Sequence, residues 1–140
     1  MKRRALILAA SVVLLPPARA TPEAMAAAIR SFTGGAPLRE GKVQLDVAPL
    51  VDNGNTVPVT ISVPGAPAAE VAALALFNER NPQSDVLRVD FGPRAATRSV
   101  STRIRLATSQ QLVALARLSD GSQWSAMVDV VVTLAACIEP

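Results

Sequence analysis

Alternation of apolar and polar residues with a period of two is the feature that most constrains the fold of this chain. In residues 42–51 (KVQLDVAPLV), Val43, Leu45 and Val47 fall on one side and polar residues on the other. Such alternation is typical of a half-buried strand. It returns in residues 56–63, 85–93, 99–108 and 110–134. With about seven short strands and a turn signal roughly every ten residues, the sequence predicts an all-β fold, an immunoglobulin-like β-sandwich.

Turn signals separate these strands. The segment 52–55 (DNGN) predicts a tight turn, because Asn-Gly tolerates the positive φ that such turns demand. Asp120-Gly121 predicts the tip of a hairpin between the last two strands. Pro58 has no backbone donor, so it indicates an edge strand or the start of a strand. Residues 73–82 fit either a helix or a strand, and Asn81-Pro82 ends that element in both cases.

One short N-terminal helix is expected before the strands. Residues 23–32 are rich in alanine and other helix formers, and a glycine pair ends the segment. Met25, Ile29 and Phe32 are spaced to share one face of this helix. The chain is therefore divided into a helix and linker over 21–36, a β-sandwich domain over 37–134 and a C-terminal arm over 135–140, with no repeat and no second folded domain.

Residues 1–20 have the layout of a secretory signal peptide. Lys2 and Arg3-Arg4 precede an apolar stretch over 5–15, and Ala18 and Ala20 provide a cleavage site before Thr21. The stretch is too short to span a bilayer, which disfavours a membrane anchor. The paired arginines are compatible with a twin-arginine leader. Without the leader the chain has ten basic and eleven acidic residues, so no basic surface indicates nucleic-acid binding.

The cysteine and histidine counts exclude several classes of chemistry. The chain has no histidine and one cysteine, so it cannot form an intramolecular disulfide or use a histidine base. Zinc, copper and haem sites built from histidine and cysteine are excluded as well. The oxygen-bearing residues over 40–55 lack the spacing of a calcium-binding EF-hand loop. We therefore expect no metal and no cofactor.

Five arginines form a second candidate site, which has two interpretations. Arg103 and Arg105 lie on one face of a predicted strand, and the guanidinium fork suits oxyanions or the carboxylates of a partner. Alternatively, they form a solvated face balanced by acidic residues such as Glu79 and Asp90. The five are Arg94, Arg98, Arg103, Arg105 and Arg117.

Cys137 also has two interpretations when only the residues are considered. Unpaired cysteines are often buried as small hydrophobes, and this one follows an apolar run. A position close to a chain end instead favours an exposed, reactive thiol. The last four residues have the length of a prenylation box, but Glu139 and Pro140 do not fit it.

A resemblance supplies a use for this thiol. Residues 32–63 (FTGGAPLREGKVQLDVAPLVDNGNTVPVTISV), 77–82 (FNERNP) and 101–137 (STRIRLATSQQLVALARLSDGSQWSAMVDVVVTLAAC) resemble the SoxY family of periplasmic sulfur carriers. The resemblance implies an immunoglobulin-like sandwich, a heterodimer with a SoxZ-like subunit, and covalent attachment of thiosulfate sulfur to Cys137. It also implies transient contacts with SoxAX, SoxB and a sulfane dehydrogenase. The family's best-known ending has glycines around the cysteine, where this chain has Ala135, Ala136 and Ile138.

The leading hypothesis is therefore a periplasmic carrier, not an enzyme, with Cys137 as the attachment site. About five extended residues would carry the thiol roughly 16 Å from the domain. The alternative is a non-catalytic interaction subunit that pairs with a SoxZ-like partner and has no covalent role.

Overall fold

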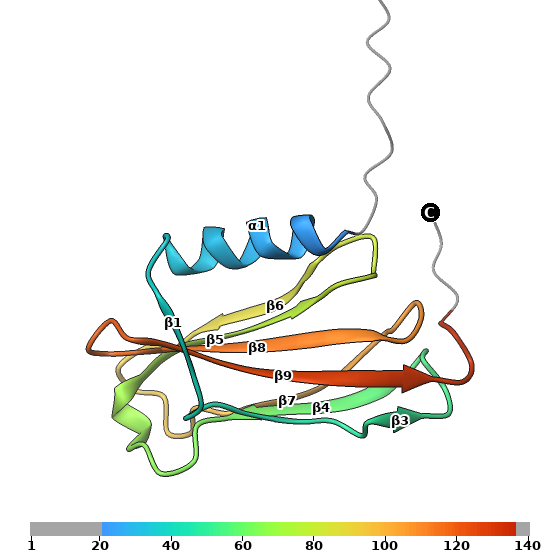
Figure 1. Ribbon diagram of the computed structural model, residues 1–140. Coiled ribbons are helices and arrows are strands. Elements are labelled where there is room, and N and C mark those ends of the chain that lie inside the picture. Colours follow the sequence, from blue (N-terminus) through green and yellow to red (C-terminus); the bar gives the residue numbers. More distant parts are fainter. Residues whose placement is uncertain (1–20, 137–140) are drawn as a thin grey trace, which may run out of the picture.

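The alternating segments form strands in the computed structural model, which describes residues 21–136 (Figure 1). The described residues also contain one α-helix, α1 (Pro22–Thr33), and a short 3-10 turn, η1 (Ala68–Glu70). The strands are β1 (Leu38–Glu40), β2 (Gln44–Asp46), β3 (Leu50–Val51), β4 (Val57–Ser62), β5 (Val71–Asn78), β6 (Asp85–Asp90), β7 (Val100–Ile104), β8 (Gln110–Leu118) and β9 (Gln123–Val132). No helix in this part of the chain is long and apolar enough to cross a membrane.

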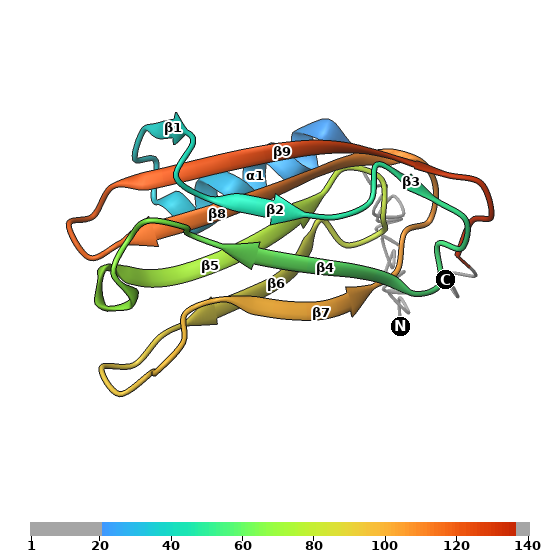
Figure 2. The same ribbon diagram turned by 90° about the horizontal axis from the view of Figure 1, so that it is seen from below.

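Two sheets pack face to face, so the predicted all-β sandwich with one short helix is confirmed. The larger sheet has the order β1-β9-β8-β5-β6, and β3 also pairs with β9; the smaller sheet has the order β2-β4-β7. Both β1 and β3 run parallel to β9, whereas the other pairs are antiparallel. Figure 2 shows the chain from β1 to β3 passing along the edge of the sandwich.

The single strand expected over 42–51 is wrong, because this segment changes sheet. β2 pairs with β4 in the smaller sheet, and β3 pairs with β9 in the larger one. Pro49 lies between the two strands and has no N–H to continue a ladder, although its carbonyl oxygen accepts a hydrogen bond from Val131 N–H at 2.8 Å. The expected inward side is correct, since Val43, Leu45 and Val47 are all buried.

β5 resolves the ambiguous segment over 73–82 as a strand. Leu74 and Leu76 are fully buried in the core between the sheets. Ala73, Ala75 and Phe77 are buried in a second cluster under α1. Because both faces of β5 are covered, its sequence does not alternate, which is why periodicity alone left it undecided.

Helix α1 lies on the outer face of the larger sheet, as the blue ribbon in Figure 1 shows. Thr21 caps its start by accepting a hydrogen bond from Ala24 N–H at 3.1 Å, and Gly34 ends it in the left-handed conformation. Met25 and Phe32 are buried against the sheet, and Ile29 packs beside them. The predicted shared face of the helix is confirmed.

The turn predictions had different outcomes. The hairpin between β8 and β9 turns at Gly121 with φ 84°, as expected. Pro58 lies at the start of β4, where it pairs only with Arg103 on β7, because β2 reaches β4 only from Thr60 onward. The turn expected over 52–55 is present at Gly54 and Asn55. The positive φ expected there is wrong, because Gly54 does not adopt a left-handed conformation.

Candidate functional site

The candidate site is the end of the sandwich at which β9 stops, on the right of Figure 1. Cys137, the predicted attachment site, lies outside the described residues, which end at Ala136. The structure therefore bears on this site through the residues that hold the chain immediately before the cysteine.

A short ladder of backbone hydrogen bonds holds these residues. Gly54 N–H donates to Leu134 O at 2.8 Å, Leu106 N–H donates to Gly54 O at 2.8 Å, and Ala136 N–H donates to Leu106 O at 3.0 Å. We call this ladder the tail seat, and its members are Gly54, Leu106, Leu134 and Ala136. The residue preceding Cys137 is thus tied to the body of the sandwich.

The segment before the tail seat is held along its length as well. Val131 and Thr133 donate from their N–H groups to the carbonyl oxygens of Pro49 and Val51, at 2.8 and 3.0 Å. Ser109 Oγ accepts a hydrogen bond from Val132 N–H at 2.9 Å. Tertiary bonds therefore continue beyond the end of β9, so the chain approaches Cys137 as an ordered segment up to Ala136.

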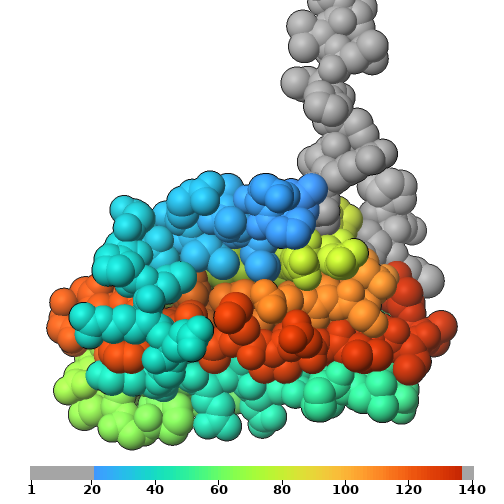
Figure 3. All heavy atoms as spheres, in the orientation of Figure 1, coloured from blue at the N-terminus to red at the C-terminus, as the bar shows by residue number. Residues whose placement is uncertain are grey.

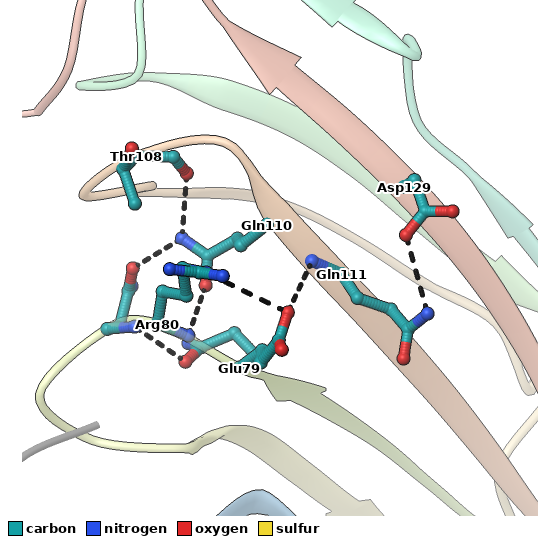
Figure 4. A network of polar contacts seen from close by, with 8 residues as sticks. Glu79, Arg80, Thr108, Gln110, Gln111 and Asp129 are labelled. Carbon is teal, nitrogen blue, oxygen red and sulfur yellow. Dashed lines mark hydrogen bonds and ion pairs between the residues drawn. The ribbon is translucent and has the colours of Figure 1, made fainter. Parts of the chain in front are cut away.

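A network of side-chain amides joins two loops at the same end of the sandwich (Figure 4). Gln110, which is 5% exposed, accepts from Arg80 N–H at 2.9 Å and donates to Asn81 Oδ1 at 2.8 Å. Asn81 Oδ1 also accepts from Ala107 N–H at 3.0 Å, and its Nδ2 donates to Arg105 O at 2.7 Å. Leu106, a member of the tail seat, is bracketed by Arg105 and Ala107, so the amide network fixes the chain on both sides of it.

The structure brings only two of the five arginines together. Arg103 and Arg105 are exposed and line one cavity of about 310 Å³ between the edges of β6 and β7, with Asn78, Asn81 and Asp85 among the other lining residues.

Two of the remaining arginines have structural contacts elsewhere. Arg98 donates to the carbonyl oxygens of Val71 and Gly92, at 2.6 and 3.2 Å. The guanidinium group of Arg117 lies over the ring of Phe32 and donates to the Phe32 carbonyl oxygen. Whether Arg103 and Arg105 bind an anion stays a prediction.

Metal ligands are not gathered in the described part of the chain. No group of three or more histidine, cysteine, aspartate or glutamate residues is placed to hold a metal ion within residues 21–136. Of the acidic side chains over 40–55, Glu40 lies on β1 and Asp46 on β2, which belong to different sheets.

The sequence interpretation did not identify the tail seat. Gly54 was correctly assigned to a turn, but its position where three backbone segments meet was not foreseen. Leu106 lies in the segment expected as a strand over 99–108, and its role in the seat depends on its backbone groups. Backbone hydrogen bonds of this kind leave little signal in residue types, because every residue except proline has the same donor and acceptor.

The chain matches the family model described as "Sulfur oxidation protein SoxY" over residues 29–137. It is similar to the solved structure of the sulfur carrier protein SoxY from Chlorobium limicola f thiosulfatophilum, with 26% identity and a TM-score of 0.68. That match covers 81% of this chain and 100% of the other. Among curated proteins, no match was found.

Superoxide reductases share the fold at lower identity. The E23A variant of the neelaredoxin from Ignicoccus hospitalis is 22% identical with a TM-score of 0.58, covering 83% of this chain and 91% of that one. A putative superoxide reductase from Thermotoga maritima is 15% identical with a TM-score of 0.55, covering 72% and 89%. At these identities the likeness extends to the sandwich fold alone.

Proposed function

The chain belongs to the SoxY family of sulfur oxidation proteins, and from this premise we propose that it carries thiosulfate-derived sulfur covalently on Cys137. The carrier itself offers a sulfur nucleophile and presents the cargo, while partner enzymes perform the oxidation and hydrolysis. This division suits a sequence that contains one thiol and no histidine.

The observation that carries the proposal is the position of Ala136. Its N–H is bonded to Leu106 O at 3.0 Å. The residue to which Cys137 is covalently joined is therefore held at one end of the sandwich. A thiol delivered from the end of a domain is accessible to several enzymes in turn, and attachment makes each later encounter a presentation of tethered substrate.

The loading step forms one sulfur–sulfur bond. The Cys137 thiolate and the terminal sulfur of thiosulfate join to give a cysteine S-thiosulfonate, with release of two electrons to a haem acceptor of the SoxAX type. Hydrolysis by a SoxB-type enzyme then consumes one water and releases sulfate and two protons, leaving a persulfide on the cysteine. The thiolate is the reactive form, and an exposed cysteine has an ordinary pKa of about 8.5, so a useful fraction is ionised near neutral pH.

We further propose that the chain is exported to the periplasm by residues 1–20 and works there as a heterodimer with a SoxZ-like subunit. A sulfane dehydrogenase is proposed to act on the remaining persulfide. Arg103 and Arg105 are candidates for contact with anionic cargo, because both are exposed on the cavity beside the loop that contains Leu106.

A second candidate function is favoured by one observation, the exposed apolar side chains on β3, on β9 and just after the end of β9. Leu50, Met127, Val131 and Leu134 are each more than half exposed, at 60%, 55%, 53% and 60%. Part of β9 is visible at the surface of the molecule in Figure 3. Leu50 is the register partner of Val131, and exposed apolar surface often marks a protein interface. This candidate is therefore an interaction subunit that pairs with a SoxZ-like partner without a covalent role.

The proposed carrier function is tested by mass spectrometry of the protein isolated from cells grown on thiosulfate. We expect a fraction of the intact chain to carry a sulfur adduct that a reductant removes, and we expect Cys137→Ser to abolish both the adduct and growth on thiosulfate. An unmodified Cys137, together with normal growth of the Cys137→Ser strain, would refute the carrier role and leave the interaction subunit as the explanation.

A relocated thiol is the control. Thr97 is exposed in the loop between β6 and β7, so Thr97→Cys on the Cys137→Ser background restores one accessible thiol at another place. We expect this variant to react with a small alkylating reagent but to carry no sulfur adduct in cells. Loading at residue 97 would show that the partner enzymes do not require the end of the sandwich.

A further inference from the structure

Gly54 lies where a side chain would collide with the tail seat. A Cβ atom placed on it would be 2.5 Å from Leu106 O, 3.0 Å from Ala136 N and 3.0 Å from Val132 Cγ1. Two of these atoms are the acceptor and donor of the hydrogen bond that ties Ala136. Even an alanine would therefore push apart the groups that hold the chain before Cys137.

The reason for glycine here is space and not conformation. Gly54 does not have a positive φ, and the other described glycines have nothing within 4 Å of a built Cβ. Five of those glycines have a positive φ, namely Gly34, Gly35, Gly41, Gly65 and Gly121. Gly92 has neither constraint. Gly54 is thus the described glycine at which close approach of backbone excludes a side chain.

We propose that Gly54 is a positioning residue for Cys137, which acts by seating Leu134 and Ala136 against Leu106. Gly54 N–H donates to Leu134 O, and Gly54 O accepts from Leu106 N–H. These two bonds join the C-terminal segment to the loop that follows β7. The biological use of this seat depends on the proposed carrier function, but the seating itself does not.

The seat also sets how far the thiol reaches. Consecutive Cα atoms lie about 3.8 Å apart, so seating Ala136 leaves a single peptide unit between the last tied residue and Cys137. Partner enzymes would therefore have to accept the end of the sandwich itself, including the loops around residues 54 and 106. The alanines before the cysteine fit this picture, because a seated segment has no need of the conformational freedom of glycine.

The experiment uses Cys137 as the only labelling site, since the chain has no other cysteine. A nitroxide spin label on Cys137 is compared by electron paramagnetic resonance in the native protein, Gly54→Ala and Gly92→Ala. We expect a restricted line shape in the native protein and in Gly92→Ala, and a shift to a mobile line shape in Gly54→Ala. Amide exchange at Ala136 should rise about tenfold or more in Gly54→Ala alone.

Trp124 fluorescence separates seating from general damage to the fold. It is the only tryptophan of the chain and belongs to the far end of β9, so its emission should be unchanged in a folded Gly54→Ala variant. Equal label mobility and equal Ala136 exchange in native protein and folded Gly54→Ala would overturn the proposal. The same shift in Gly92→Ala would overturn it too.

If Gly54→Ala does not fold, a pair of substitutions at Ala136 tests the tail seat instead. Ala136→Pro removes the N–H that donates to Leu106 O, whereas Ala136→Ser keeps it. A mobile label in Ala136→Pro but not in Ala136→Ser supports the seat, and equal mobility in both refutes it. Because the labelled thiol cannot carry sulfur, these results are independent of the carrier assay, and either idea can fail while the other stands.

Discussion

The two ends of the sandwich are held by different kinds of contact. The tail end consists of residues 53–55, 79–84, 105–110 and 132–136. It is joined by backbone ladders and by the side-chain amides of the buried Gln110 and the half-buried Asn81. The hairpin end consists of residues 39–42 and 118–124, where Lys42 lies over the ring of Trp124 at 4.5 Å from its centroid. There Trp124 Nε1–H donates to Ser122 Oγ and the Ser122 hydroxyl donates to Asp120. Longer-range backbone bonds, such as Ser119 N–H to Glu70 O at 2.8 Å, hold this end as well.

This difference indicates at which end the loss of a single contact should cost more stability. Hydrogen bonds between segments far apart in the chain hold the tail end, and several of the bonded groups are buried. When one such group is removed, its former partner has no water molecule to bond instead, which costs stability. At the hairpin tip, the side chains of Lys42, Asp120 and Ser122 are exposed or half-buried, so each of their contacts contributes little. If the protein carries sulfur on Cys137, the hydrogen bonds of the tail end would fix the point at which the C-terminal segment leaves the domain.

The largest expected effect comes from removing the central amide of the tail end. Gln110→Ala leaves Arg80 N–H without its acceptor and removes the donor to Asn81 Oδ1 and Thr108 O. We expect the free energy of unfolding to fall by about 3 kcal/mol, because buried polar groups lose their partners. Urea denaturation followed by circular dichroism measures the change.

Gln111→Ala is the matched control, with the same substitution on the next residue of β8. The Gln111 side chain donates to Asp129 at 3.3 Å on the exposed outer face (Figure 4). We expect a loss of no more than about 0.5 kcal/mol. Similar losses for the two variants would contradict the importance of burial at the tail end, since we expect burial and not residue type to set the loss of stability.

The structure of the hairpin end was easier to predict from the sequence than the structure of the tail end. At the hairpin end, Asp120-Gly121 has a local conformational meaning, and the turn was predicted correctly because residue type decides it. At the tail end, Gly54 does lie in a turn, but the reason for glycine was misread as a positive φ, because nothing in its neighbours reveals that residues 106 and 136 approach it. Likewise the split of residues 42–51 between two sheets depends on what pairs with β9, which alternation does not encode.

The core was predicted well for a related reason. Inward positions such as Val59, Ile61 and Leu106 follow from period two, and all are buried. Gln110, by contrast, looks like an ordinary polar residue at a strand start, yet it is buried. Two of its hydrogen-bond partners, Arg80 and Asn81, lie roughly thirty positions away in the chain. The local sequence pattern predicts the secondary structure and burial of a residue, but it does not predict which distant residue forms its hydrogen bonds.

A medium effect is expected at Lys42, which has a left-handed backbone with φ 57°. Lys42→Ala keeps this unfavourable conformation and loses the cation over Trp124, so we expect it to be less stable than the native protein by about 1 kcal/mol. Lys42→Gly loses the same cation but adopts the conformation freely, so it should be more stable than Lys42→Ala by about 1 kcal/mol. Thermal unfolding compares the three proteins, and equal stability of the alanine and glycine variants would contradict the left-handed assignment.

The smallest expected effect concerns the carboxyl group of Asp120 at the hairpin tip. The pKa of Asp120 is lowered from its ordinary value chiefly by the hydrogen bond from the Ser122 hydroxyl at 2.6 Å, and then by the bond from Ser122 N–H at 2.9 Å. The charges of Lys42 and Arg39 add to this in the same direction. A lowered pKa means that the folded state favours the ionised carboxylate.

The sign of the pH dependence follows from that preference. Since the folded pKa lies below the unfolded value, the contribution of Asp120 to stability is present above the unfolded pKa and is lost as the pH falls through the folded pKa. In Ser122→Ala the hydroxyl donor is gone, so the pKa of Asp120 should move up toward its ordinary value, as a carboxyl-detected NMR titration would record. The acid-induced loss of stability should then be slightly smaller than in the native protein, while Ala136 amide exchange should not change. A change at Ala136 would mean that the two ends of the sandwich are coupled, which their separate contacts do not predict.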